Sequence, residues 1–221
     1  MKFKLVRRPI GNLGTNCILI ANNETKRLIV FDAPFDKRDG MSAIDFVNEF
    51  SGIGYGIEAL LFTHGHFDHT MGAMPIAKIA AQVIAHEGDR RLFTIPKLMA
   101  GWVEPEELAF LEPVPVTHWL TGQGRQVIPL IGLTVEARHT PGHSPGGVVY
   151  CVKELHLAIV GDTIFKESVG RTDLPGGCWS ELLHSIDTQI IGLKDDTKLY
   201  PGHGLMSTIS YEKKNNKFLK I

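Results

Sequence analysis

The segment FTHGHFDHT (residues 62–70) places three histidines and one aspartate within six positions. It continues the apolar run IEALLF (residues 57–62), which is typical of a buried β-strand. Residues two apart in an extended segment point to the same side, so His64 and His66 can face one point together. Asp68 and His69 follow after the chain begins to turn and can face a second point. The spacing therefore predicts two adjacent metal half-sites.

Three more candidate ligands each follow an apolar run and lie beside a glycine. They are His143 in HTPGHSPGG (139–147), Asp162 in LAIVGDTIF (157–165) and His203 in KLYPGHG (198–204). Imidazole and carboxylate groups suit Zn(II), Fe(II) or Mn(II), and the set contains no cysteine, which argues against a structural thiolate zinc site. A carboxylate such as Asp162 can bridge two cations, and two divalent ions can share a hydroxide and lower its pKa. We treat the other five histidines as ordinary core or surface residues.

The hydrophobic pattern predicts strands that precede helices in both halves of the chain. Strands are expected over residues 3–10, 16–22, 27–32, 57–64, 82–87, 146–152, 155–165 and 197–204, with a β-rich stretch over 116–144. Helices are expected over 41–50, 70–82 and 178–193, with a mixed region over 88–112 and a frayed helix or extension over 211–221. No repeat or low-complexity linker divides the chain, so we expect one domain over residues 1–221.

Composition gives no sign of a nucleic-acid or membrane partner. Apolar residues make up 43% of the 221 positions, charged residues 21%, and the formal net charge is −1. This balance argues against a nucleic-acid partner, which would select a basic surface. We find neither a signal-peptide core nor an apolar run of the ~18 residues that a membrane span needs. Three widely separated cysteines, Cys17, Cys151 and Cys178, are expected to be reduced thiols in a cytoplasmic protein.

The segments THGHFDH, TPGHSPGG, GDTIF and PGHG, in that order, resemble the metallo-β-lactamase superfamily over nearly the whole chain. The resemblance implies an α/β fold of the αββα sandwich type, in which two mixed β-sheets are flanked by helices. It also implies roles for eight residues: His64, His66 and His143 hold a first metal ion, Asp68, His69 and His203 hold a second, Asp162 bridges the two, and Asp32 in IVFDAP supports the histidine loop.

Within the superfamily, TPGHSPGG, GDTIF and VGRTDLPGG (169–177) resemble the short, single-domain glyoxalase II-like hydrolases of bacteria. This implies cleavage of a thioester, S-lactoylglutathione or a related acyl-thiol, by a metal-bound hydroxide that Asp68 orients. The expected cofactors are two divalent metal ions, with zinc favoured over iron or manganese. Only 18 residues follow His203, so we expect no glutathione-binding helical domain at that end. Arg171 is then the candidate to bind a substrate carboxylate, unless it only pairs with Asp173.

Other functions also agree with parts of this sequence pattern. Persulfide dioxygenases share the histidine cluster and a GRTD stretch (170–173), and they use one iron ion held by residues matching His64 or its neighbours, His143 and Asp162. Another superfamily hydrolase, such as a lactonase, also fits the ligand set. A phosphodiesterase acting on RNA agrees poorly with the near-neutral charge. A non-enzymatic metal-binding member would need a broken ligand set, and all seven ligands are present.

Overall fold

The first β-sheet of the computed structural model, which describes residues 1–35 and 42–219, has the strand order β1-β2-β3-β4-β5-β6. Its strands are β1 (Phe3–Ile10), β2 (Thr15–Asn22), β3 (Arg27–Phe31), β4 (Gly56–Leu61), β5 (Gln82–His86) and β6 (His118–Leu120). The pairs β1/β2 and β2/β3 are antiparallel, whereas β3/β4, β4/β5 and β5/β6 are parallel. The sheet is therefore mixed.

The second sheet has the order β14-β13-β10-β9-β8-β7. Its strands are β7 (Arg125–Leu130), β8 (Leu133–His139), β9 (Val148–Val152), β10 (Leu157–Gly161), β13 (Lys198–Pro201) and β14 (Ser207–Thr208). Only β10/β13 is a parallel pair among these, so this sheet is also mixed. A small hairpin, β11 (Ile164–Phe165) and β12 (Ser168–Val169), follows β10.

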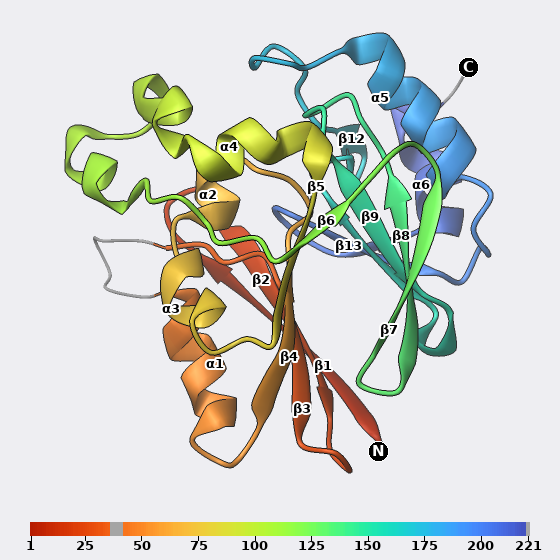
Figure 1. Ribbon diagram of the computed structural model, residues 1–221. Coiled ribbons are helices and arrows are strands. Elements are labelled where there is room, and N and C mark those ends of the chain that lie inside the picture. Colours follow the sequence, from red (N-terminus) through yellow and green to blue (C-terminus); the bar gives the residue numbers. More distant parts are fainter. Residues whose placement is uncertain (36–41, 220–221) are drawn as a thin grey trace.

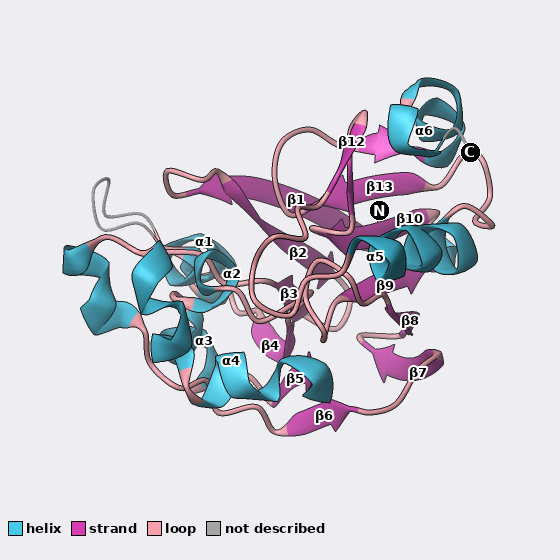
Figure 2. Ribbon diagram, turned by 90° about the horizontal axis from the view of Figure 1, so that it is seen from above, coloured by secondary structure: helices cyan, strands magenta, loops and turns pink. Residues whose placement is uncertain are grey.

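Helices cover the outer face of each sheet. They are α1 (Ala43–Ser51), α2 (Phe67–Thr70), α3 (Ala73–Ala77), α4 (Arg90–Thr94), α5 (Trp179–Ser185) and α6 (Ile209–Asn215). Seen from above, α1 to α4 lie on one side of the strands, and α5 and α6 lie on the other (Figures 1 and 2). The predicted αββα sandwich with two mixed sheets is therefore confirmed.

The alternation of side chains along β2 shows why its central residues, 17–21, are all apolar. All eight residues of this strand are buried. Leu19 packs in the cluster formed with Phe46 of α1 and Ile76 of α3, whereas Ile20 packs between the two sheets with Tyr150 of β9. Because successive side chains point to opposite faces, a strand covered on both faces needs apolar residues at every position.

Two predicted helices are shorter than the sequence pattern indicates. The stretch 70–82 is interrupted where Gly72 donates its N–H to the carbonyl of Ala33, so α2 and α3 are separate. The stretch 178–193 forms α5 and then a π-helical turn over Ile186–Ile190. The helix expected over 41–50 is observed as α1, and its first residue, 41, lies outside the described residues.

The polar tail of the chain is anchored in the fold by buried hydrogen bonds. Residues 209–215 form α6, and Glu212 is completely buried. The Glu212 carboxylate accepts hydrogen bonds from Ser207 Oγ, from Glu167 N at 2.9 Å and from Asn216 Nδ2 at 2.9 Å. A buried carboxylate without partners would cost free energy, so these bonds explain how Glu212 can be buried when α6 packs against the fold. Residues 209–215 are therefore a packed helix, and residues 220–221 of the predicted tail lie outside the described residues. No helix of the described residues is long and apolar enough to cross a membrane.

Candidate metal centre

The seven predicted ligands meet at one edge of the sandwich. They lie in segments that follow β4, β8, β10 and β13, and the second, third and fourth of these strands belong to one sheet, whereas β4 belongs to the other. The chain turns sharply after each strand, which brings polar side chains from four distant segments together. Three groups of these side chains place one ligand atom each within 4.8 Å of one another: His64, His66 and His143; His64, His69 and Asp162; and Asp68, His69 and His203.

The first group is a set of three buried imidazoles. His66 Nδ1 lies 2.9 Å from His143 Nε2, and the rings of His64 and His143 are 4.8 Å apart. Nε2 of His64 and Nε2 of His66 are buried and have no hydrogen-bond partner among residues 1–35 and 42–219. Buried polar atoms normally have partners, so these bare nitrogens fit a site that a cation completes.

The second group is acidic as well as basic. His203 Nε2 lies 3.2 Å from Asp68 Oδ2, and His69 Nε2 lies 3.4 Å from the same oxygen. The Asp162 carboxylate lies between the two groups: Oδ1 is 3.5 Å from His69 Nε2, and Oδ2 is 3.5 Å from His143 Nε2 and 3.4 Å from His203 Nε2. One carboxylate therefore reaches histidines of both groups.

Protein acceptors fix the orientation of three of the ligand rings. Nδ1 of His143 lies 2.7 Å from the carbonyl of Arg171, and Nδ1 of His203 lies 2.9 Å from that of Leu13. Nδ1 of His69 lies 2.8 Å from Asp32 Oδ2. Carbonyl and carboxylate oxygens only accept, so each Nδ1 carries a hydrogen and Nε2 is the ring nitrogen that faces the centre.

Asp32 joins the histidine segment to the end of β3. Its carboxylate also accepts hydrogen bonds from Thr63 N and Thr63 Oγ1, both at 2.8 Å. Its backbone φ is 57°, a left-handed conformation that aspartate tolerates better than most residues. The structure therefore places Asp32 directly behind His69, where it holds the ring.

The charges of the centre favour a cation. Burial lowers the pKa of His66 to about 3, and burial also lowers the pKa of His64, so both rings stay neutral. Burial lowers the pKa of His203 as well, but Asp162 and Asp68 outweigh it and raise the pKa to about 11. In His69 the same balance, with Asp68 first among the carboxylates, raises the pKa to about 9. The carboxylates thus favour positive charge at the centre, which protons on His69 and His203 can carry and which a bound cation would supply in their place.

Two cavities open beside the ligands. The larger, about 540 Å³, is lined by His66, Asp68, His143, Asp162 and His203 together with Leu13, Phe67, Trp102, Phe165 and Arg171. Arg171 is 56% exposed and pairs with Asp173 through Nε–Oδ1 and Nη2–Oδ2 contacts of 2.6 and 2.7 Å. Its guanidinium also lies 5.8 Å from the ring centre of Trp102. Arg171 is thus at the cavity and at the same time in an ion pair.

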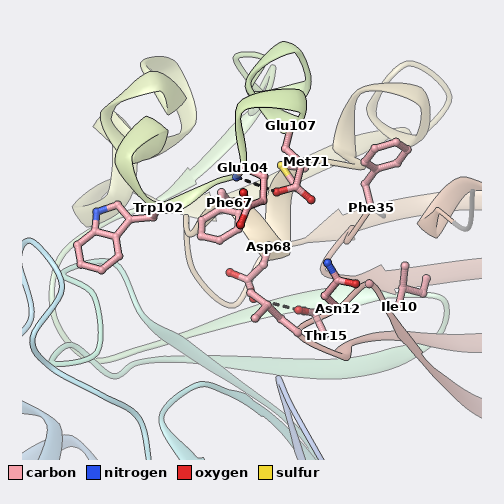
Figure 3. A pocket seen from close by; sticks show the side chains of 12 residues that line it. Ile10, Asn12, Thr15, Phe35, Phe67, Asp68, Met71, Trp102, Glu104 and Glu107 are labelled. Carbon is pink, nitrogen blue, oxygen red and sulfur yellow. Dashed lines mark hydrogen bonds between the residues drawn. The ribbon is translucent and has the colours of Figure 1, made fainter. Parts of the chain in front are cut away.

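The smaller cavity, about 140 Å³, shares Asp68, Phe67 and Trp102 with the larger one. Asp68 and Thr15 lie on one side of it, joined by a hydrogen bond of 2.9 Å, and Glu104 and Glu107 lie on the opposite side (Figure 3). Asp68 therefore faces both cavities, between the metal ligands and open space.

The sequence matches a known protein family over most of its length. The family model described as the metallo-beta-lactamase superfamily matches residues 10–203. The chain belongs to the metallo-beta-lactamase superfamily. Within it, the chain is 32% identical over 214 residues to a protein of Haemophilus influenzae named hydroxyacylglutathione hydrolase GloC, covering 96% of this chain and 95% of that protein.

Two solved structures are similar to this chain over nearly its whole length. One is the BLEG-1 B3 metallo-beta-lactamase, with a TM-score of 0.82 and 29% identity, covering 99% of this chain and 100% of that one. The other is TTHA1623 in a di-iron-bound form, with a TM-score of 0.77 and 30% identity, covering 97% and 100%. The chain is therefore related to metallo-hydrolases.

Sequence reasoning missed two residues that support the ligands of this superfamily member. Thr63 connects Asp32 to the first histidine, and its Oγ1 lies 3.1 Å from His64 Nδ1. Asp89 is buried, and its carboxylate accepts hydrogen bonds from Gly65 N and Gly146 N, in the two segments that carry the first group. The sequence contained a signal for Asp89. The apolar run VIA (residues 83–85) is followed by HEGD (residues 86–89), which again places a glycine beside an aspartate after a strand.

Proposed function

We propose that this protein is a binuclear metal-dependent hydrolase that cleaves a thioester, S-lactoylglutathione or a related acyl-thiol. The observation that carries the proposal is the position of Asp162, whose two oxygens lie 3.4 to 3.5 Å from histidines of both ligand groups. A carboxylate in that position suits two ions better than one. The similarity to a hydroxyacylglutathione hydrolase over 96% of the chain supports the substrate class.

The proposed ligands are those that the sequence predicts. His64, His66 and His143 would hold one ion, Asp68, His69 and His203 would hold the other, and Asp162 lies where it could contact both. The unpartnered nitrogens of His64, His66 and His69 support this assignment. Nitrogen and carboxylate ligands without thiolate suit zinc, which we favour, and also iron or manganese.

The chain's own groups divide the remaining work. Bound ions would supply a hydroxide at neutral pH and polarise the acyl carbonyl. Asp68 faces the cavity and can accept a hydrogen bond from the attacking water, which orients it toward the carbonyl carbon. The attacking oxygen bonds to the acyl carbon, the C–S bond then breaks, and the sulfur leaves as a thiolate. The proton left on the product acid passes to solvent, because a carboxylic acid is ionised at neutral pH. Because thiols have a pKa of about 8.5, the leaving group requires no general acid.

Substrate recognition is proposed to divide between an apolar wall and one cation. Phe67, Trp102 and Phe165 line the larger cavity and can exclude water from the reacting atoms. We assign Arg171 to a carboxylate of the substrate. Its pair with Asp173 is exposed to water, so exchanging that partner for a substrate carboxylate costs little.

The proposed setting of the enzyme is a small-molecule reaction in the cytoplasm. The three cysteines Cys17, Cys151 and Cys178 lie far apart in the sequence, and we propose that they are reduced thiols in that compartment. We treat residues 1–221 as one hydrolase domain, with no nucleic-acid or membrane partner. The formal net charge of −1 supports the absence of a polyanionic substrate.

A hydrolysis screen with metal analysis tests the proposal. Purified protein is assayed for thiol release from S-lactoylglutathione and simpler thioesters, and for opening of lactones and β-lactams. Its metal content is measured on the same batch, and His66→Ala serves as the control. Thioester turnover well above the control is expected. Turnover at the level of His66→Ala would contradict the proposal, and one iron per chain with oxygen uptake on glutathione persulfide would favour a dioxygenase.

A further inference from the structure

The buried carboxylate of Asp89 connects the two segments that carry the first ligand group. Asp89 ends the 3₁₀ turn Glu87–Asp89 after β5 and is 1% exposed. Its Oδ2 accepts hydrogen bonds from Gly65 N at 2.8 Å and from Ser144 Oγ at 2.7 Å, and its Oδ1 accepts one from Gly146 N at 2.7 Å. Gly65 lies between two ligand histidines, and Ser144 directly follows the third.

The segments approach Asp89 so closely that only glycine fits. A Cβ atom on Gly65 would lie 2.8 Å from Leu92 Cβ and 3.1 Å from Asp89 Cβ. A Cβ atom on Gly146 would lie 2.4 Å from Asp89 N and 2.7 Å from Asp89 Cγ. Contacts below 3.0 Å force a shift of the backbone, so the glycines keep both ligand segments against this carboxylate.

The three groups that donate hydrogen bonds to the Asp89 carboxylate are all neutral. No lysine or arginine within the described ranges 1–35 and 42–219 forms an ion pair with it. A buried carboxylate without a counter-charge is costly to keep. A cation held by His64, His66 and His143 would supply that charge from the other side of the two segments.

We infer that Asp89 is a positioning residue that sets the metal affinity of the first ligand group by fixing Gly65, Ser144 and Gly146 at once. The inference rests on the proposed metal centre. It extends that centre by one carboxylate, which acts through the backbone of the ligand segments and touches neither substrate nor metal. In the second group, Asp32 does this work by direct contact with His69. The two groups would thus each depend on one buried carboxylate of their own.

The test substitutes Asp89→Asn, which keeps the shape of the side chain. The amide removes the charge and turns one NH₂ toward a donor, so at least one of the three hydrogen bonds is lost. Zn²⁺ dissociation constants are measured on the metal-free protein by competition with a chromophoric chelator. The comparison is repeated in a His203→Ala background, where the remaining ion reports on the first group. We expect the first group to bind Zn²⁺ ~10–100-fold more weakly, as for other carboxylates that support ligands.

Glu212→Gln is the matched control, because Glu212 is another fully buried carboxylate with neutral donors, in α6. It should lower thermal stability without changing Zn²⁺ affinity. Unchanged affinity in Asp89→Asn, or equal losses in both variants, would overturn the inference. If the wild type binds two ions but hydrolyses no thioester, the proposed function fails while the inference stands.

Discussion

Asp32 and His69 share a hydrogen bond of 2.8 Å between Oδ2 and Nδ1, and their side chains are 2% and 0% exposed. Asp32 is also the acceptor for Thr63 N and Thr63 Oγ1. One buried carboxylate therefore serves both the ligand ring and the segment that leads into the histidine cluster. Loss of this carboxylate should affect stability and metal binding together.

Asp32→Ala is predicted to lower the free energy of unfolding by about 1–3 kcal/mol for each buried donor it leaves unpaired. Metal affinity should fall ~10–100-fold, because His69 loses its fixed orientation. Urea unfolding of the metal-free protein and a Zn²⁺ titration measure the two effects. Asp45→Ala, which removes the capping box of α1, should lower stability alone. Metal affinity that falls equally in both variants would show that Asp32 has no special role.

Asp162→Asn is predicted to remove the bridge between the ligand groups. The amide keeps the size of the side chain but loses the charge, so bound metal should fall from two ions to about one per chain. The rate constant kcat for thioester hydrolysis should fall on the order of 10²–10³-fold. Metal analysis and kinetics on one batch provide both values.

The control for Asp162→Asn is Asp196→Asn, the same change at a surface carboxylate that pairs with His156 at 2.9 Å. It should leave metal content and kcat unchanged. Two tightly bound ions in Asp162→Asn would contradict a bridging role.

The three cysteines are predicted to react very differently. Burial raises the pKa of Cys17, and burial also raises the pKa of Cys151 to about 11. The hydroxyl of Ser180 lowers the pKa of the partly exposed Cys178. Iodoacetamide at pH 8 should therefore alkylate only Cys178 in the folded protein and all three thiols after denaturation. Peptide mass spectrometry identifies the sites, and rapid labelling of Cys17 in folded protein would contradict the buried position of β2.

Most strands and the seven candidate ligands could be predicted from local patterns, whereas the two-sheet sandwich was predicted from the family resemblance. Apolar strands that end in glycine beside histidine or aspartate bring ligands to one edge whatever the details of the loops. The break between α2 and α3 could not be predicted, because it depends on the long-range hydrogen bond from Gly72 to Ala33. The sequence marks Asp89 by the glycine beside it, but it does not give the partners of Asp89, since its three donors come from segments 24 to 57 residues away.

Arg171→Ala is predicted to discriminate between charged and uncharged substrates. An exposed pair between an arginine and a carboxylate contributes about 0.2–1 kcal/mol, so KM for S-lactoylglutathione should rise by a few-fold. KM for a thioester without carboxylates should stay unchanged, and kcat should change little for either, as expected when only uniform binding is lost. Steady-state kinetics with the two substrates measure this difference.

Asp173→Asn should have the opposite effect on KM, because it removes the carboxylate that pairs with the guanidinium of Arg171. It should lower KM for S-lactoylglutathione by a few-fold at low ionic strength, and the gain should shrink as salt screens the freed charge. If Arg171→Ala raises KM equally for both substrates, the side chain acts by packing near Trp102. In that case the carboxylate assignment is wrong and the apolar wall alone selects the substrate.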